Sequence, residues 1–212
     1  ITWSNDDDYF MVANNWVRNN TTHAYNFTTF KSGAGVNRIE NNSAEVNTAG
    51  SIYGMNFGTI PAATTLMINN NSLLDEYTQN SWTQYAFNFG TVTAGSFVSL
   101  NYNVHRNFAN GLTNASPASV SQTGNAAGGT SFDNNNITGI CGAPECINLG
   151  SPSTDFTDLD LSRNDVGVAG GSFNQTNFWP QQTGGARVYL VKTPRTVVQS
   201  STINAKADSY DR

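Results

Sequence analysis

The stretch TLMINNNSLL, residues 65–74, decides how this chain is expected to fold. A short apolar run ends in three asparagines, and a second short apolar run follows directly. Asparagine tolerates the left-handed backbone conformation and bonds to nearby backbone groups through its side-chain amide. The stretch therefore predicts a β-strand, a sharp bend built by asparagine, and another strand.

Runs of the same kind recur along the chain at MVANNWV (11–17), NRIENNSAEV (37–46), FVSLNYNVH (97–105) and SFDNNNITGI (131–140). Their leading asparagines are 27, 28, 32 and 33 residues apart: Asn14, Asn41, Asn69, Asn101 and Asn134. A loose repeat of this period is typical of a solenoid, in which stacked bends align asparagine amides into a ladder. We therefore expect an all-β fold of parallel coils, with a β-sandwich as the alternative because short strands and polar turns suit it too.

The composition limits the possible functions and compartments. Only 12% of the residues are charged and the formal net charge is -5, which argues against a nucleic-acid partner. No apolar stretch approaches the roughly 18 residues of a membrane span. Cys141 and Cys146 flank a turn in CGAPEC, so a local disulfide and an extracellular or cell-surface location are expected, with two buried thiols as the alternative. The opening ITWSNDDDYF indicates a mature product or a segment of a longer protein.

Changes in composition and in the apolar–polar pattern along the chain predict its domain organisation. Residues 1–185 are expected to form the coils, with a closing cap at about 141–171. The low-complexity stretch 107–130 is interpreted as a long loop leaving the solenoid or as a flexible insertion. Beyond it, residues 186–212 alternate apolar and polar side chains, which predicts a short C-terminal β element or the start of a further β domain.

The stretch DLDLSRNDVGVAGG, residues 158–171, concentrates acidic side chains before a run of glycines. Asp158, Asp160 and Asp165 invite a calcium hypothesis, because hard cations take several oxygen ligands from such loops. The spacing is not that of an EF-hand, however. The simpler interpretation is a set of turn formers that bond to backbone amides, with Arg163 paired to one of them, and no cofactor.

This stretch resembles the closing segment of right-handed parallel β-helix proteins secreted by Bacteroidota, whose last coils end close to "aGNPxxxxxDxDGSRNDxGxyGG". The matching positions are Gly150, Pro152, Asp158, Asp160, Ser162, Arg163, Asn164, Asp165, Gly167, Gly170 and Gly171. The sequence departs from the pattern at Leu161, usually glycine, and at Ala169, often aromatic. The resemblance implies a right-handed parallel β-helix, a structural role for Arg163 and Asn164 in a cap over the open end, and a type IX-secreted surface protein.

Other candidate sites are sparse. His23 and His105 have no cysteine, aspartate or second histidine at ligand spacing. Trp82 and Trp179 are the best candidates for stacking on sugars, although core packing is the simpler interpretation of both. The acidic and basic residues of the coil region show no grouping that would favour a polysaccharide lyase.

Two functional hypotheses follow from these observations. The first is a non-catalytic scaffold or adhesin segment that presents a binding face to another surface or secreted protein or to a surface glycan. The second is a carbohydrate-active β-helix enzyme whose catalytic coils lie partly outside this chain. A groove with converging carboxylates would favour the enzyme, and an even Asn/Ser/Thr face would favour the scaffold.

Overall fold

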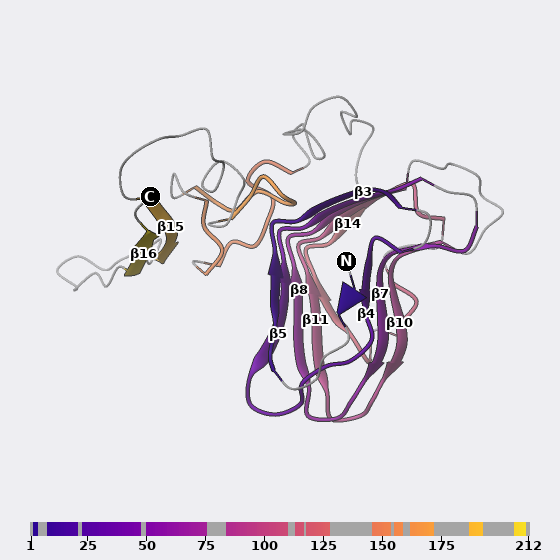
Figure 1. The fold of residues 1–212 in the computed structure, drawn as a ribbon. Helices are drawn as coiled ribbons and strands as arrows, with labels where there is room; N and C mark the ends of the chain where they lie inside the picture. The colour runs from indigo at the N-terminus through magenta and orange to yellow at the C-terminus, as the bar shows by residue number, and fades with distance from the viewer. Residues whose placement is uncertain are drawn as a thin grey trace.

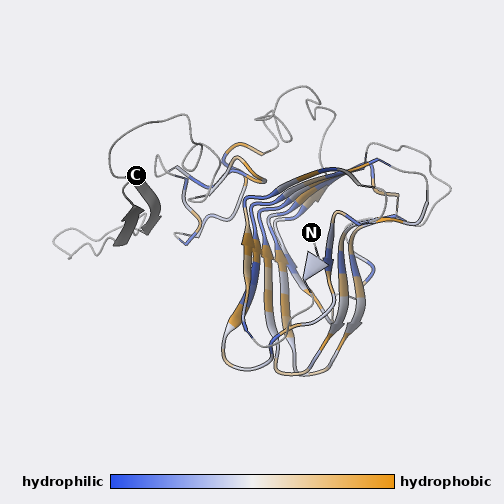
Figure 2. Ribbon diagram, in the orientation of Figure 1, coloured by the Kyte–Doolittle hydropathy of each residue, from blue (hydrophilic) through white to orange (hydrophobic). Residues whose placement is uncertain are grey.

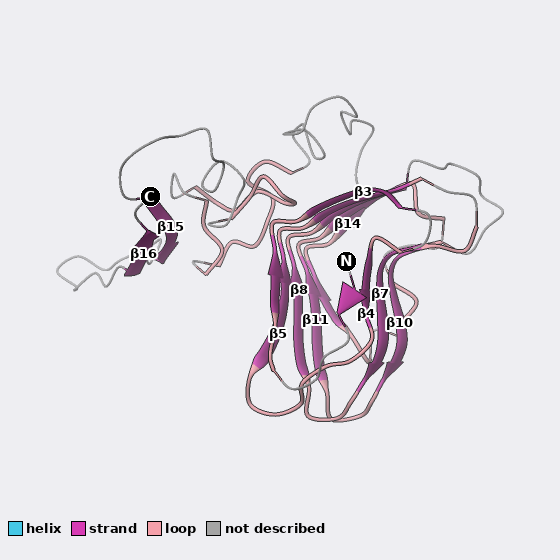
Figure 3. Ribbon diagram, viewed as in Figure 1, coloured by secondary structure: helices cyan, strands magenta, loops and turns pink. Residues whose placement is uncertain are grey.

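The computed structural model describes residues 2–3, 8–20, 23–47, 50–75, 84–109, 113–116, 118–127, 146–153, 155–158, 162–171, 187–192 and 206–210. Within these ranges the secondary structure is strands, turns and loops, with no helix (Figure 3). None of the described residues belongs to a helix long and apolar enough to cross a membrane.

The chain winds through three parallel sheets in repeating order, which confirms the predicted parallel β-helix (Figure 1). Sheet A contains β1 (Thr2–Trp3), β4 (Tyr25–Phe27), β7 (Tyr53–Ile60) and β10 (Tyr85–Val92). Sheet B contains β2 (Met11–Ala13), β5 (Val36–Glu40), β8 (Thr65–Asn69), β11 (Phe97–Asn101) and β13 (Ser121–Thr123). Sheet C contains β3 (Trp16–Asn20), β6 (Ser43–Val46), β9 (Ser72–Asp75), β12 (Val104–Arg106) and β14 (Ala126–Ala127).

The coils enclose one apolar core, because alternate residues of each strand point inward in register. In sheet B, Ile39 pairs with Ile68 and Ile68 with Leu100, and all three side chains are fully buried. In sheet A, the rings of Phe57 and Phe89 stack with centroids 4.7 Å apart. Hydrophobic and hydrophilic residues accordingly alternate along the strands (Figure 2).

The low-complexity stretch does not leave the solenoid as the sequence led us to expect. Its described part contributes β13 and β14, which pair in parallel with β11 and β12. This part of the interpretation is wrong because Gly124 and Asn125 form a bend equivalent to the asparagine pairs of earlier coils. The run predicted as the last repeat, 131–140, lies outside the described residues together with Asn134.

The C-terminal element is a pair of antiparallel strands. β15 (Arg187–Lys192) and β16 (Lys206–Tyr210) pair with an irregularity between Val188 and Leu190. They form a two-stranded sheet of their own, separate in pairing from the three coil sheets.

Candidate functional site

The corner between sheets B and C contains one residue per coil in the left-handed backbone region. Their φ angles lie between 52° and 64°, and the residues are Asn14, Asn41, Asn70, Tyr102 and Gly124. Three of the five are asparagines and one is glycine, the types that adopt this conformation at least cost. Of the predicted leading asparagines, Asn14 and Asn41 occupy this position, whereas Asn69 and Asn101 are the last residues of the preceding strands.

An asparagine ladder runs through the residue that follows each corner. The ladder is present as predicted, but four of its rungs lie one or two residues after the predicted positions: Asn15, Asn42, Asn71 and Asn103. The fifth rung, Asn125, lies in the stretch interpreted as a loop. The amide nitrogen of each rung donates to the amide oxygen of the next, at 2.9 to 3.1 Å. The backbone N–H of the earlier rung donates to that same oxygen in every step.

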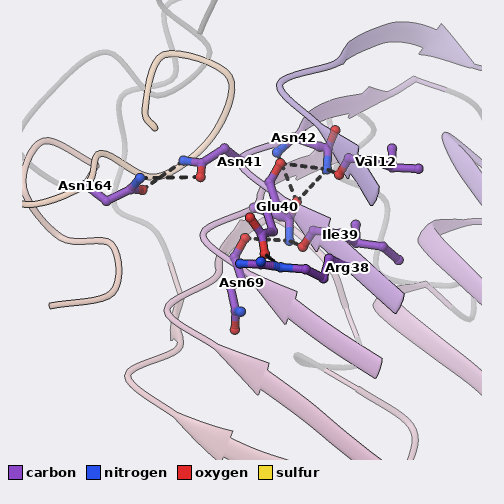
Figure 4. Close-up of polar contacts among 9 residues, drawn as sticks. Val12, Arg38, Ile39, Glu40, Asn41, Asn42, Asn69 and Asn164 are labelled. Carbon is purple, nitrogen blue, oxygen red and sulfur yellow. Dashed lines mark hydrogen bonds and ion pairs between the residues drawn. The ribbon is translucent and has the colours of Figure 1, made fainter. Parts of the chain in front are cut away.

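Each rung also closes its own corner. The Asn42 amide donates to Glu40 O two residues back and to Val12 O in the previous coil, as Figure 4 shows. Asn71 repeats both bonds with Asn69 O and Ile39 O. Each of these buried amides donates to backbone carbonyls that would otherwise be unpaired. A buried polar group without a hydrogen-bond partner costs about 1–3 kcal/mol of stability.

The left-handed corner residues bind the segment predicted as the closing cap. We call its described residues, 146–153, 155–158 and 162–171, the strap. The Asn41 amide donates to Asn164 Oδ1 at 2.8 Å (Figure 4). It also donates to Asp165 O at 2.8 Å. Asn14 donates to Val168 O and Gly170 O. The strap therefore binds the outward-facing residues of this corner, and the residues that follow them form the ladder.

The third coil completes this contact. Asn70 accepts from Ser151 N through its amide oxygen and from Gly167 N through its backbone carbonyl. The Arg163 guanidinium lies 5.6 Å from the Tyr102 ring centroid and donates to Gly150 O. The sequence predicted a cap over the open end of the coil, but these bonds place the strap along its side, across four consecutive coils.

An apolar contact accompanies the strap bonds. Cys146 and Val166 pack with Val104 of β12 in a small buried cluster on the outer face of sheet C. Cys141 lies outside the described residues, so its pairing with Cys146 stays a prediction.

The aspartates of the strap bond to backbone amides. Asp158 accepts from Gly171 N and Asp165 N, one with each carboxylate oxygen, and Asp165 accepts from Asn148 N at 2.6 Å. Asp160 lies outside the described residues. Among the residues that the structure describes, no three His, Cys, Asp or Glu side chains gather as a metal site would require. The carboxylates thus fix the turns of the strap, and Arg163 bonds to carbonyls rather than to an aspartate.

Two buried acidic residues of the coils, Glu40 and Glu45, lie in ion pairs. Glu40 pairs with Arg38 of the same strand, and Glu45 pairs with Arg18 at 2.5 Å, with both glutamates almost fully buried. One surface groove, lined by 96–98 and 118–122, contains only uncharged side chains.

The outer face of sheet A has a second asparagine column that the sequence analysis missed. Asn26, Asn56 and Asn88 stand opposite one another in register, half-exposed, with Asn56 donating to Asn26 and Asn88 donating to Asn56. Gly58 and Gly90 lie two residues after Asn56 and Asn88 and have no side chain. A Cβ at Gly58 would meet Thr28 O at 2.9 Å. The strands β4, β7 and β10 contain no charged residue.

Aromatic rings border this asparagine column. His23 stacks on Tyr53 with centroids 4.9 Å apart, and Tyr53 lies 6.4 Å from Tyr85 in the next coil. All three side chains are partly exposed. Burial lowers the pKa of His23 below its ordinary 6.5, so this ring is neutral at pH 7. We call the His23, Tyr53 and Tyr85 column and the Asn26, Asn56 and Asn88 column together the amide–aromatic face.

The predicted sugar-binding residues Trp82 and Trp179 lie outside the described residues. Comparison of the chain with protein families, with curated proteins and with solved structures found no match. The resemblance of the strap sequence to β-helix closing segments therefore stays a prediction, and the functional argument depends on the site itself.

Proposed function

We propose that this chain is a non-catalytic, extracellular β-helix scaffold whose amide–aromatic face binds a neutral surface glycan. The observation that supports this proposal most directly is the half-exposed, uncharged array of amides and rings on sheet A. Its repeat follows the strand spacing of about 4.8 Å. An extended polysaccharide with a short repeat can meet several coils with equivalent contacts.

The amides offer both kinds of hydrogen bond that sugar hydroxyls need. Asn26 Nδ2 donates to no described residue, and Asn88 Oδ1 accepts from none. The side-chain amides of Asn56 and Asn88 each have two N–H groups and donate one of them within the column, so the second N–H can bind a ligand. A sugar hydroxyl can donate and accept a hydrogen bond at the same time. Such groups suit this column, which ends in a donor at Asn26 and an acceptor at Asn88.

The tyrosine column supplies the apolar part of such a site. Pyranose rings present C–H faces that pack on aromatic rings, and tyrosine adds a hydroxyl at its edge. Because the coils fix Tyr53 and Tyr85 in register, the face loses little conformational entropy on binding. A rigid, repetitive face favours extended chains over small sugars.

An extracellular location is supported by the composition and by the expected Cys141–Cys146 disulfide. Docking to a second surface protein and export by a type IX system remain extensions of the proposal that depend on the sequence resemblance.

The test is a sedimentation assay against a panel of insoluble and soluble polysaccharides, neutral and acidic. We expect the wild type to bind a neutral member and Asn56→Ala to weaken that binding, since Asn56 is the central amide of the column. Phe97→Ala is the matched control, because it removes an exposed ring from sheet B, away from the face. Binding confined to acidic polysaccharides, or equal effects of the two variants, would overturn the proposal.

A further inference from the structure

The outer face of sheet A continues beyond its asparagine column. The same four residues, Asn-Phe-Gly-Thr, occur at 56–59 in β7 and at 88–91 in β10, in register. Both phenylalanines are buried in the core, whereas the two threonines and Gly90 are exposed and Gly58 is partly exposed. Along each of these strands the outer face therefore presents a tyrosine, an amide, a glycine and a threonine, in that order.

At the glycines the backbone itself is the surface of the protein. Glycine within a strand often marks a place where another backbone or a ligand approaches closely. Gly58 fits the first case, because a Cβ there would lie 2.9 Å from Thr28 O. A Cβ at Gly90 would meet nothing nearer than Gly58 O at 3.3 Å, so the fold gives a weaker reason for glycine at this position. Since Gly90 is exposed, the second case, approach by a ligand, is favoured there.

The glycines lie between two rows of hydrogen-bonding groups. We call Gly58 and Gly90, with the asparagine column on one side and Thr59 and Thr91 on the other, the glycine track. The hydroxyls of Thr59 and Thr91 are exposed and form no hydrogen bond within the described part of the chain. A hydroxyl donates and accepts, and the amides of the asparagine column have a second N–H to donate. The glycine track therefore offers uncharged donors and acceptors from both sides.

The outer face of sheet A is wider than one glycan chain. From Tyr53 to Thr59, at about 3.3 Å per residue, it spans about 20 Å, roughly twice the width of an extended pyranose chain. The tyrosines and the glycine track lie on opposite sides of the asparagine column, so a chain that packs along one of them leaves the other open. Both repeat at the strand spacing of about 4.8 Å along the coil axis.

We propose that the amide–aromatic face and the glycine track together bind two neighbouring chains on the ordered surface of a β-1,4-linked neutral polysaccharide. The inference rests on the proposed function and deepens it, because it names the form of the glycan. One chain packs along the tyrosines, the next lies along the glycines, and the asparagines bond to hydroxyls of both. In cellulose and chitin every linkage is equatorial, so the chains extend as flat ribbons and pack side by side, whereas α-1,4-linked chains coil.

Order in the ligand should strengthen binding. Two chains held side by side let both parts of the face bind at once, so the second contact is made at high effective concentration. In a disordered polysaccharide the spacing between chains varies, and one part of the face stays empty. We therefore expect the dissociation constant to be lower for the ordered form, by at least about tenfold.

The test compares binding isotherms on crystalline cellulose and crystalline chitin with isotherms on the same materials swollen in phosphoric acid, which separates the chains. We expect the wild type to bind the crystalline form of one of them at least about tenfold more tightly than the swollen form. This comparison requires no variant. Gly90→Val, which fills the glycine track with a side chain, and Thr59→Ala/Thr91→Ala, which removes its hydroxyls, should both lose the preference. Ser121→Val, at an exposed position of sheet B, is the matched control and should retain it.

Circular dichroism spectra identical to the wild type verify that each variant is folded. A wild type that binds crystalline and swollen forms equally would overturn the inference. So would binding confined to other neutral polysaccharides, a folded Gly90→Val that keeps the preference, or a Ser121→Val that loses it. In each of these cases the proposed function stands, because a neutral glycan is still bound. A wild type that binds no neutral polysaccharide at all would contradict the proposed function itself, and the inference with it.

Discussion

The amide nitrogen of Asn42 lies 3.0 Å from the amide oxygen of Asn71 in the next coil, and both side chains are buried. That bond runs from coil to coil, alongside the backbone ladders of sheets B and C. Its neighbours Asn41 and Asn70 turn their amides outward and bind the strap. Two consecutive residues at one corner thus hold the stack together on the inside and fasten the strap on the outside.

Asn71→Ala should lower the free energy of unfolding by about 3 kcal/mol or more. The substitution removes the bonds to Ile39 O and Asn103 Oδ1 and deprives Asn42 of its acceptor, and each buried group left unpaired costs about 1–3 kcal/mol. Denaturant unfolding measures the change. Asn88→Ala, on the half-exposed column of sheet A, should cost less than about 1 kcal/mol. Equal losses for the two variants would show that the buried ladder has no special role.

Asn41→Gly should loosen the strap and leave the coils folded. Glycine adopts the φ of 52° at no cost, so the change removes the amide bonds to Asn164 and Asp165 without straining the corner. We expect faster limited proteolysis within residues 146–171 and an unchanged circular dichroism spectrum. Asn107→Gly is the matched control, because Asn107 also has a positive φ of 63° but bonds to Asp75 O away from the strap. Equal cleavage rates in the two variants would contradict the assignment.

The stability of the protein should fall as the pH drops below about 6.5. Burial lowers the pKa of His105 below the ordinary 6.5 that it regains on unfolding. At pH values below 6.5 the unfolded chain therefore binds more protons than the folded one, and protonation favours unfolding. His105→Leu, in register with Leu73, should flatten the dependence of the unfolding free energy on pH between 7 and 5. An equally steep dependence in this variant would locate the proton uptake elsewhere.

The Cys141–Cys146 disulfide can be tested by alkylation of the unfolded protein without reductant. We expect no alkyl group on either cysteine, and two groups after reduction. Because Cys146 packs with Val104 and Val166, reduction should also speed proteolysis of the strap. Full alkylation before reduction would favour the alternative of two buried thiols.

The sequence was sufficient to predict the coil architecture, and the reason is local. An apolar run that ends in Asn-Asn encodes both a strand and its bend, so TLMINNNSLL identifies a corner on its own. The structural role of each asparagine in that run depends on the residues that surround it in the folded protein. Asn69 ends the strand, Asn70 takes the left-handed position and Asn71 enters the ladder, and only the register with adjacent coils assigns these roles.

Two features had signals that the sequence analysis did not use. The tripeptides YNF, MNF and FNF, at 25–27, 55–57 and 87–89, repeat an asparagine before an inward phenylalanine and mark the column of sheet A. Gly-Asn at 124–125 repeats the corner in a stretch interpreted as a loop. The position of the strap had no such signal, because bonds such as that between Asn41 and Asp165 join residues 124 apart in the chain.

The most direct test of the proposed function is calorimetric titration of a soluble neutral polysaccharide into the wild type and into Tyr53→Ala/Tyr85→Ala. We predict that the wild type binds with an affinity that added salt leaves unchanged, because the amide–aromatic face has no charge. The double variant should stay folded and lose at least about tenfold in affinity, roughly 1.4 kcal/mol. Unchanged affinity in the double variant, or wild-type binding that salt abolishes, would contradict the account.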